Sequence, residues 1–194
     1  PGDNSVDLLT QDIGLVAFTN NAEKLIGCNV YVGGGMGRTH NNEETFARIA
    51  DPIGYIPAEN VLELVQAILA LQRDFGNRKS RKNARMKYLI NSKGIKWFID
   101  KLKTKYYEHP ISELKAEPNA KLLDYLGWHQ QSKGLYFVGL PFLSGRLESE
   151  VKNKLSLLVK KYQLELRLTP NQDLLLCNIG QYQKDSVKRD LKEI

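Results

Sequence analysis

Apolar and polar positions alternate in two different patterns along this chain. Near the N-terminus, two β-rich runs at residues 15–19 and 24–32 flank an Asn20–Asn21 turn, which predicts a hairpin. From residue 60 to 75, apolar side chains recur at three- and four-residue steps and stop before Gly76, which predicts an amphipathic helix. Shorter helices are expected over residues 45–50 and 82–91, and another after Gly94.

The second half of the chain has the order β–β–α–β–β. Two strands are expected around a turn at residues 132–134, then a helix at 148–162, then strands at 164–168 and 174–179. Two prolines between residues 109 and 119 mark a boundary. We therefore predict an α+β fold with a mixed sheet and helices in residues 1–110. A linker follows at 111–120, a half domain at 121–180, and a further segment begins at 181–194. A module of about 60 residues buries little surface alone, so it is expected to need a partner half.

Charge is concentrated in one short segment, which we call the basic segment (residues 73–88). It holds seven basic side chains and one acid, which equals the net charge of +6 of all 194 residues. The remainder is neutral overall, which favours a local anion site over a generally basic surface. If the segment is helical, Arg78, Arg81 and Arg85 form one stripe suited to carboxylates or phosphates. The alternatives are a solvated helix face and a nucleic-acid patch, although the segment has few aromatic residues.

Three consecutive glycines, Gly33, Gly34 and Gly35, end the second strand of the predicted hairpin. Glycine allows a positive φ and lets a ligand or another backbone approach closely. The pattern GGGMG is not the dinucleotide-binding GxGxxG, and a bulged strand end explains it equally well. Arg38 and His40 follow at once, so this loop is a second candidate anion site.

Few other residues are candidates for a metal site or a catalytic site. Cys28 and Cys177 lie far apart within apolar strand patterns, so buried free thiols are expected rather than metal ligands. His129 is expected to be structural, and no Ser/His/Asp or Cys/His arrangement stands out. Asn171 and Gln172 fit a tight turn between two strands. No apolar run approaches the ~20 residues of a membrane span.

Four segments taken together resemble the sirohaem-dependent nitrite and sulfite reductases. They are NVYVGGGMGRTHNNEETFARIADPIGYIP, QRDFGNRKSRKNARMKYLI, LGWHQQ and RLTPNQDLLL, and they look most like the ferredoxin-dependent sulfite reductases of cyanobacteria and plastids. GGGMGRTH favours the sulfite branch over ferredoxin–nitrite reductase, which is the alternative. The resemblance implies sirohaem coupled to a 4Fe–4S cluster, six-electron reduction of sulfite to sulfide, and ferredoxin as electron donor. It also implies bacterial cytoplasm or plastid stroma as the location.

The resemblance also implies which domain each segment belongs to and which residues bind sirohaem. Residues 1–110 would be part of the sirohaem and iron–sulfur domain, and 121–180 a ferredoxin-like half domain. The implied sirohaem-binding residues are Gly33, Gly34, Gly35, Arg38, His40, Arg78, Arg81, Arg85, Lys87, Asn171 and Gln172. The family's four cluster cysteines and its sulfite-binding lysines have no counterpart here, so we expect an internal piece that is inactive without the remaining polypeptide. A basic binding module for nucleic acid or an acidic partner remains a further alternative, with nucleic acid the less favoured, and no membrane partner is expected.

Overall fold

The first unit of the structure is built on a three-stranded antiparallel sheet. The computed structural model describes residues 1–121 and 124–194, and the chain divides after Lys121 into two units. In the first unit β1 (Ile13–Thr19) pairs with β2 (Leu25–Val32), which pairs with β3 (Asp51–Pro57). The predicted hairpin is thereby confirmed, as is the α+β class, although these strands pair antiparallel rather than in a mixed sheet.

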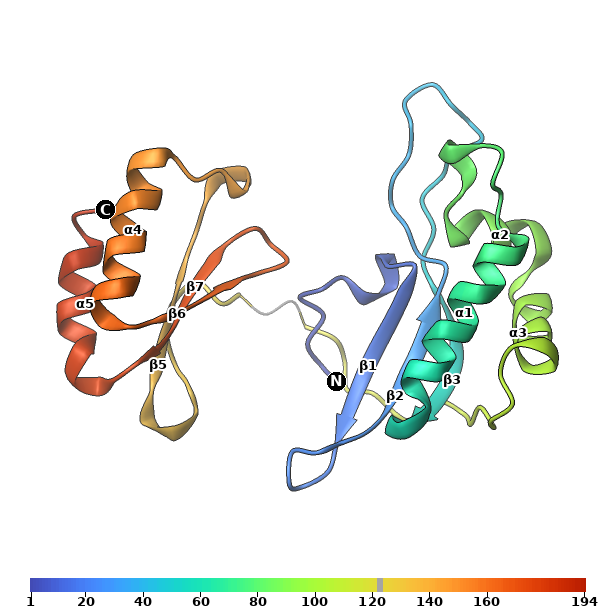
Figure 1. The fold of residues 1–194 in the computed structure, drawn as a ribbon, viewed down its shortest axis with the longest axis horizontal. Helices are drawn as coiled ribbons and strands as arrows, with labels where there is room; N and C mark the ends of the chain where they lie inside the picture. Colours follow the sequence, from blue (N-terminus) through green and yellow to red (C-terminus); the bar gives the residue numbers. More distant parts are fainter. Residues whose placement is uncertain (122–123) are drawn as a thin grey trace. The chain divides into compact units, whose positions relative to one another are not determined.

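Three helices pack against this sheet (Figure 1). They are α1 (Val61–Phe75), α2 (Met86–Lys93) and α3 (Ile95–Lys105). The apolar face of α1 that the spacing predicts is buried, since Leu64, Ile68 and Leu71 have no exposed surface. The shared core of sheet and helices also contains Val30, Val32, Ile56, Ile90, Phe98 and Leu102.

One predicted helix in this unit is wrong, and another begins later than predicted. Residues 45–50 form no helix; they run extended beside the glycines through a Gly35–Arg48 bridge and lead into β3. Pro52 lies inside β3, where it is tolerated because β3 is an edge strand of this sheet. α2 begins at Met86 rather than at residue 82, and only a short 3-10 turn, Arg81–Asn83, precedes it.

Residues 111–120, which the sequence predicts to be a linker, are anchored along the sheet at Ser112 and Lys115. Ser112 bridges Tyr55 through two backbone hydrogen bonds of 3.0 and 3.1 Å. The fully buried amide of Asn29 donates to the Lys115 carbonyl (2.8 Å) and accepts from the Lys115 N–H (3.0 Å). Asn29 lies in an apolar strand pattern, and its sequence carries no signal of this role.

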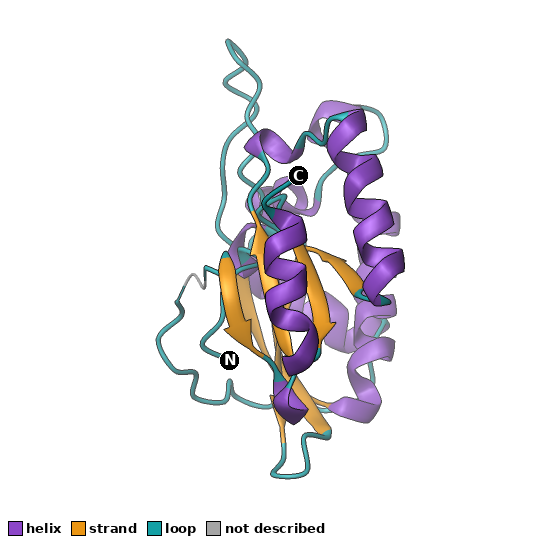
Figure 2. Cartoon of the chain, turned by 90° about the vertical axis from the view of Figure 1, so that its left-hand side faces the viewer, coloured by secondary structure: helices purple, strands orange, loops and turns teal. Residues whose placement is uncertain are grey.

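The second unit is a four-stranded antiparallel sheet with two helices (Figure 2). The strand order is β4 (Gly127–Gln130), β5 (Tyr136–Leu140), β7 (Leu174–Ile179) and β6 (Glu165–Leu168). α4 (Ser149–Tyr162) and α5 (Lys184–Leu191) share a core with this sheet through Leu155, Leu158 and Val187. Residues 181–194 therefore pack with the half domain, whereas the sequence-based division set them apart.

No helix within residues 1–121 and 124–194 is both long and apolar enough to cross a membrane.

Candidate functional site

The three consecutive glycines continue the path of β2 and are held by main-chain hydrogen bonds. We call residues 33–46 the glycine loop. Its first N–H groups donate to carbonyls of neighbouring segments: Gly33 to Asp12 (2.8 Å), Gly34 to Gln11 (3.0 Å) and Gly35 to Arg48 (2.8 Å). Gly33 has φ +79°, a left-handed conformation that favours glycine. The start of the loop is therefore fixed by the chain itself.

The space beside these glycines is filled by protein atoms. A Cβ on Gly34 would lie 2.2 Å from the Leu9 carbonyl oxygen, and one on Gly33 would lie 2.5 Å from Ile90 Cδ1. A Cβ on Gly35 would meet the Arg85 guanidinium at 2.7 Å. The glycines thus admit another part of the same chain, and Gly37, beside which nothing lies within 4 Å, is the glycine that faces open space.

Lys87 lies beneath the glycine loop, with 1% of its surface exposed. Its ammonium donates to the carbonyl oxygens of Gly35 (3.1 Å), Gly37 (2.7 Å) and Phe46. An ammonium has three N–H donors, so none remains for a ligand carboxylate. Burial, and then the positive charge of Arg85, lower the pKa of Lys87. Lys87 therefore supports the loop, which corrects the expectation that it holds a carboxylate directly.

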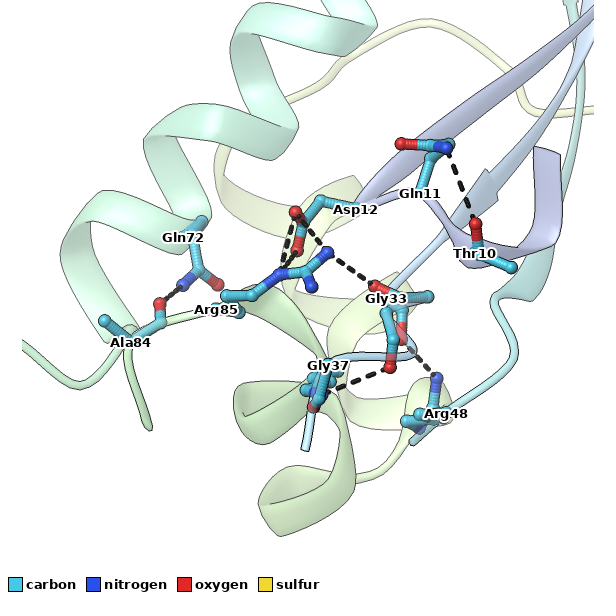
Figure 3. Close-up of polar contacts among 12 residues, drawn as sticks. Thr10, Gln11, Asp12, Gly33, Gly37, Arg48, Gln72, Ala84 and Arg85 are labelled. Atoms are coloured by element: carbon cyan, nitrogen blue, oxygen red, sulfur yellow. Dashed lines mark hydrogen bonds and ion pairs between the residues drawn. The ribbon is translucent and has the colours of Figure 1, made fainter. Parts of the chain in front are cut away.

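Arg85 is the second cation beneath the loop (Figure 3). Its guanidinium pairs with Asp12 at 2.9 Å and donates to the Gly34 carbonyl at 3.3 Å, while 41% of the side chain stays exposed. Arg48 has a related role that the sequence did not reveal, because it donates to the Gly33 carbonyl (3.0 Å) and pairs with Asp51. Asp12 and Asp51 partly neutralise these two arginines.

Four other candidate cations are exposed and have no carboxylate partner among the described residues: Arg38, His40, Arg78 and Arg81. Arg38 and His40 line an open hollow of about 630 Å³ in the glycine loop, together with Asn41, Asn42 and the acid Glu43. Because residues 78–85 contain no α-helix and only the 3-10 turn Arg81–Asn83, the three arginines Arg78, Arg81 and Arg85 do not form the predicted stripe. Arg78 lies in a loop, where its Nε donates to the Arg73 carbonyl at 3.4 Å.

The glycine loop and the basic segment nevertheless lie side by side. Besides the contacts of Lys87 and Arg85, the Asn83 amide donates to the Glu44 carbonyl at 3.3 Å. Figure 1 shows the glycine loop rising above the sheet next to the connection between α1 and α2. The two segments that hold most of the candidate cations are therefore neighbours within the first unit, and the loop also contributes the acids Glu43 and Glu44 there.

Asn171 and Gln172 belong to the second unit, in the turn between β6 and β7. Gln172 has φ +70°, and the turn is closed by the Thr169 N–H donating to the Asp173 carbonyl at 3.0 Å. The Asp173 carboxylate also accepts the Phe142 N–H at 3.1 Å. The predicted turn is confirmed.

Both cysteines are buried and free, as expected, and one lies in each unit. Burial is the main cause that raises the pKa of Cys28 and of Cys177. Within the described ranges, no group of three or more His, Cys, Asp or Glu side chains could hold a metal ion. His129 stacks on Phe137 at 4.9 Å, in keeping with a structural role.

Comparison with known protein families assigns both units. Residues 1–111 match the nitrite and sulphite reductase 4Fe-4S domain, which covers more than half of the chain. This chain belongs to the nitrite and sulfite reductase family. Residues 129–194 of this nitrite and sulfite reductase chain match the ferredoxin-like half domain of the same enzymes.

Individual relatives agree with this assignment. A sulfite reductase (ferredoxin) from Synechococcus elongatus is 46% identical over 100% of this chain and 31% of its own length. A sulfite reductase (NADPH) hemoprotein beta-component from Lysinibacillus sphaericus is 38% identical over 96% of this chain and 33% of its own. The solved structure of Mycobacterium tuberculosis NirA matches with a TM-score of 0.83 and 26% identity over 98% of this chain and 34% of that one. The chain thus spans about a third of the length of these relatives.

Proposed function

We propose that this chain is a segment of a ferredoxin-dependent sulfite reductase and forms part of its sirohaem pocket. The observation that carries the proposal is that Arg38, His40, Arg78 and Arg81 are exposed, lack a carboxylate partner among the residues that the structure describes, and lie in two segments that contact each other. The family match over residues 1–111 supports the identity of the ligand. When bound, sirohaem coupled to a 4Fe–4S cluster would pass electrons from the ferredoxin donor to sulfite, which is reduced to sulfide.

The residues present fit the carboxylate rim of such a cofactor. A guanidinium donates two parallel hydrogen bonds to a carboxylate, and Arg38, Arg78 and Arg81 are free to do so. Arg85 would contribute its exposed portion, while Asp12 offsets part of its charge. For Asn171 and Gln172, a role in sirohaem binding rests on the family resemblance of their turn alone. The glycines at 33–35 would shape the loop rather than touch the ligand, since chain atoms fill the space beside them.

The residues present do not fit the iron–sulfur cluster. A 4Fe–4S cluster is held by four thiolates, whereas this chain has two cysteines, both buried and in different units. A raised thiol pKa disfavours the thiolate that binds iron. We therefore assign the cluster ligands to other segments of the parent polypeptide and expect the isolated chain to be inactive.

The pocket assignment is tested by titrating the isolated chain with sirohaem and following absorbance. We expect weak binding, with an affinity poorer than about micromolar. The Arg78→Gln plus Arg81→Gln variant should weaken it further, by about tenfold per lost charge-assisted contact. Lys103→Gln plus Lys105→Gln, which removes the same charge from exposed positions on α3, is the matched control. Equal losses in both variants would show that general charge, not this surface, attracts the cofactor.

The reaction is tested in the full-length parent protein. We expect sulfite to be turned over faster than nitrite, and reduced ferredoxin to serve as donor in preference to NADPH with a flavoprotein. Faster turnover of nitrite would place the parent in the nitrite branch. Exclusive use of NADPH would agree instead with relatives such as the Lysinibacillus sphaericus protein.

A further inference from the structure

The glycine loop is closed at its base by the Gly35–Arg48 backbone bridge and by one buried side chain. Lys87 binds the carbonyls of Gly35 and Gly37 at the start of the loop and that of Phe46 at its end. The rings of Phe46 and Tyr88 flank the ammonium at 5.7 and 5.1 Å from their centroids. One cation thus joins two chain segments that are nine residues apart.

The free-energy cost of burying the Lys87 ammonium depends on the conformation of the glycine loop. A buried charge is costly unless its hydrogen bonds are satisfied. Among the described residues no carboxylate forms an ion pair with Lys87, and the charge of Asp12 offsets only part of the cost of burying this ammonium. Its only polar partners are the three loop carbonyls, so the ammonium is stable here only while the loop holds its shape. The dependence is mutual, because without the ammonium the carbonyls would lose their shared donor.

The tip of the loop has its own internal order. The buried hydroxyl of Thr45 accepts the Thr39 N–H at 2.8 Å and donates to the Asn42 carbonyl at 2.9 Å. The Thr45 N–H donates to the same carbonyl at 3.1 Å. Arg38 and His40 lie next to these anchored residues, so closing the base also fixes where their side chains emerge.

We propose that Lys87 is a positioning residue that presents Arg38 and His40, in one loop conformation, to a carboxylate-bearing ligand. The identity of that ligand as a tetrapyrrole polycarboxylate rests on the proposed function; the clamping of the loop does not. Lys87 acts without touching the ligand, since all three of its donors are used by the chain.

The test measures loop order and ligand binding separately in the whole 194-residue chain. Hydrogen exchange of the Thr39, Asn42 and Thr45 amides reports the loop. Fluorescence titration with uroporphyrin, a soluble tetrapyrrole polycarboxylate, reports binding. We expect Lys87→Met to accelerate exchange of these amides and to weaken uroporphyrin binding, each by about tenfold. Lys82→Met, which removes an exposed lysine of the same segment, should leave loop exchange unchanged.

Chemical rescue separates a clamp from simple packing. In Lys87→Ala, added ethylammonium should enter the vacated site and restore both protection and binding, whereas ethanol at equal concentration should not. Sodium chloride at matched ionic strength controls for screening. Equal rescue by ethanol would mean that Lys87 fills space only and would overturn the proposal.

Three outcomes decide the inference. If Lys87→Met folds and hydrogen exchange of the loop amides is unchanged, the proposal is wrong. If that variant does not fold, the unmodified chain still decides, because free exchange of the Thr39, Asn42 and Thr45 amides there would exclude a clamped loop. If loop exchange responds but uroporphyrin binds Arg38→Gln as tightly as wild type, the clamp stands and the proposed cofactor surface is wrong.

Discussion

Replacing Gly34 by alanine should destabilise the first unit selectively. The new Cβ would lie 2.2 Å from the Leu9 carbonyl oxygen and 2.7 Å from that of Gln11. Ordinary nonbonded contact is roughly 3.5 Å, so one segment must move by about 1 Å. Both atoms belong to main chain and cannot swing aside as a side-chain end could.

The magnitude follows from what that movement breaks. Overpacking typically costs about 1–3 kcal/mol. The Gly34 N–H bond to Gln11 (3.0 Å) and the Ala50 N–H bond to Leu9 (2.8 Å) would stretch, at about 1 kcal/mol each. We therefore expect a loss of about 2–4 kcal/mol in the free energy of unfolding, since partial relaxation spares some of each contribution.

Urea unfolding followed by tryptophan fluorescence measures this loss. The chain has two tryptophans, and Trp97 packs against the core of the first unit, so a Trp128→Phe background makes the signal report that unit alone. With a slope of about 2 kcal/mol per molar urea, the midpoint should fall by about 1–2 M.

Gly37→Ala is the matched control, because nothing lies within 4 Å of its added methyl and its φ is not positive. Its stability should be unchanged or raised by up to about 1 kcal/mol through a less flexible unfolded chain. The reasoning is refuted if Gly34→Ala and Gly37→Ala unfold at the same urea concentration. That result would mean that the neighbouring backbone yields without cost.

Three further predictions concern buried groups. Asn29→Ala should cost about 2–4 kcal/mol in urea unfolding, because it leaves the Lys115 N–H and carbonyl without their partner. Burial and the hydrogen bond to Glu117 raise the pKa of Tyr31 to about 12. The pKa of Tyr106 and of Tyr107 is raised as well, mainly by burial, so ultraviolet titration should show a late-ionising fraction that Tyr31→Phe reduces. The unfolded pKa is about 10, so the contribution of Tyr31 to stability should be present below pH 10 and lost as the pH rises toward 12. Cys28 and Cys177 should resist thiol reagents until the chain unfolds, and rapid labelling of native protein would contradict their burial.

Elements with a strong period could be predicted from the sequence. The apolar face of α1 spans four turns, and the hairpin of β1 and β2 alternates around a polar turn, so local spacing alone specifies both. The same holds for α4 and for the strands around residues 132–134. The concentration of charge at residues 73–88 is also visible in the sequence, whereas its position beside the glycine loop comes from the structure.

Side-chain partners across long sequence separations were decided only by the tertiary structure. In the sequence, Lys87 and Arg85 look like equivalent cations. In the folded chain, Lys87 is buried under carbonyls some 50 residues earlier in the chain, and Arg85 pairs with Asp12. Residues 45–50 read as a helix, but bridging to Gly35 made them extended. The sequence by itself determined which segments carry apolar faces and where positive charge gathers, because both are local properties. Burial and hydrogen bonding between distant segments then determined which charges stay free for a ligand, since only the folded chain sets those distances.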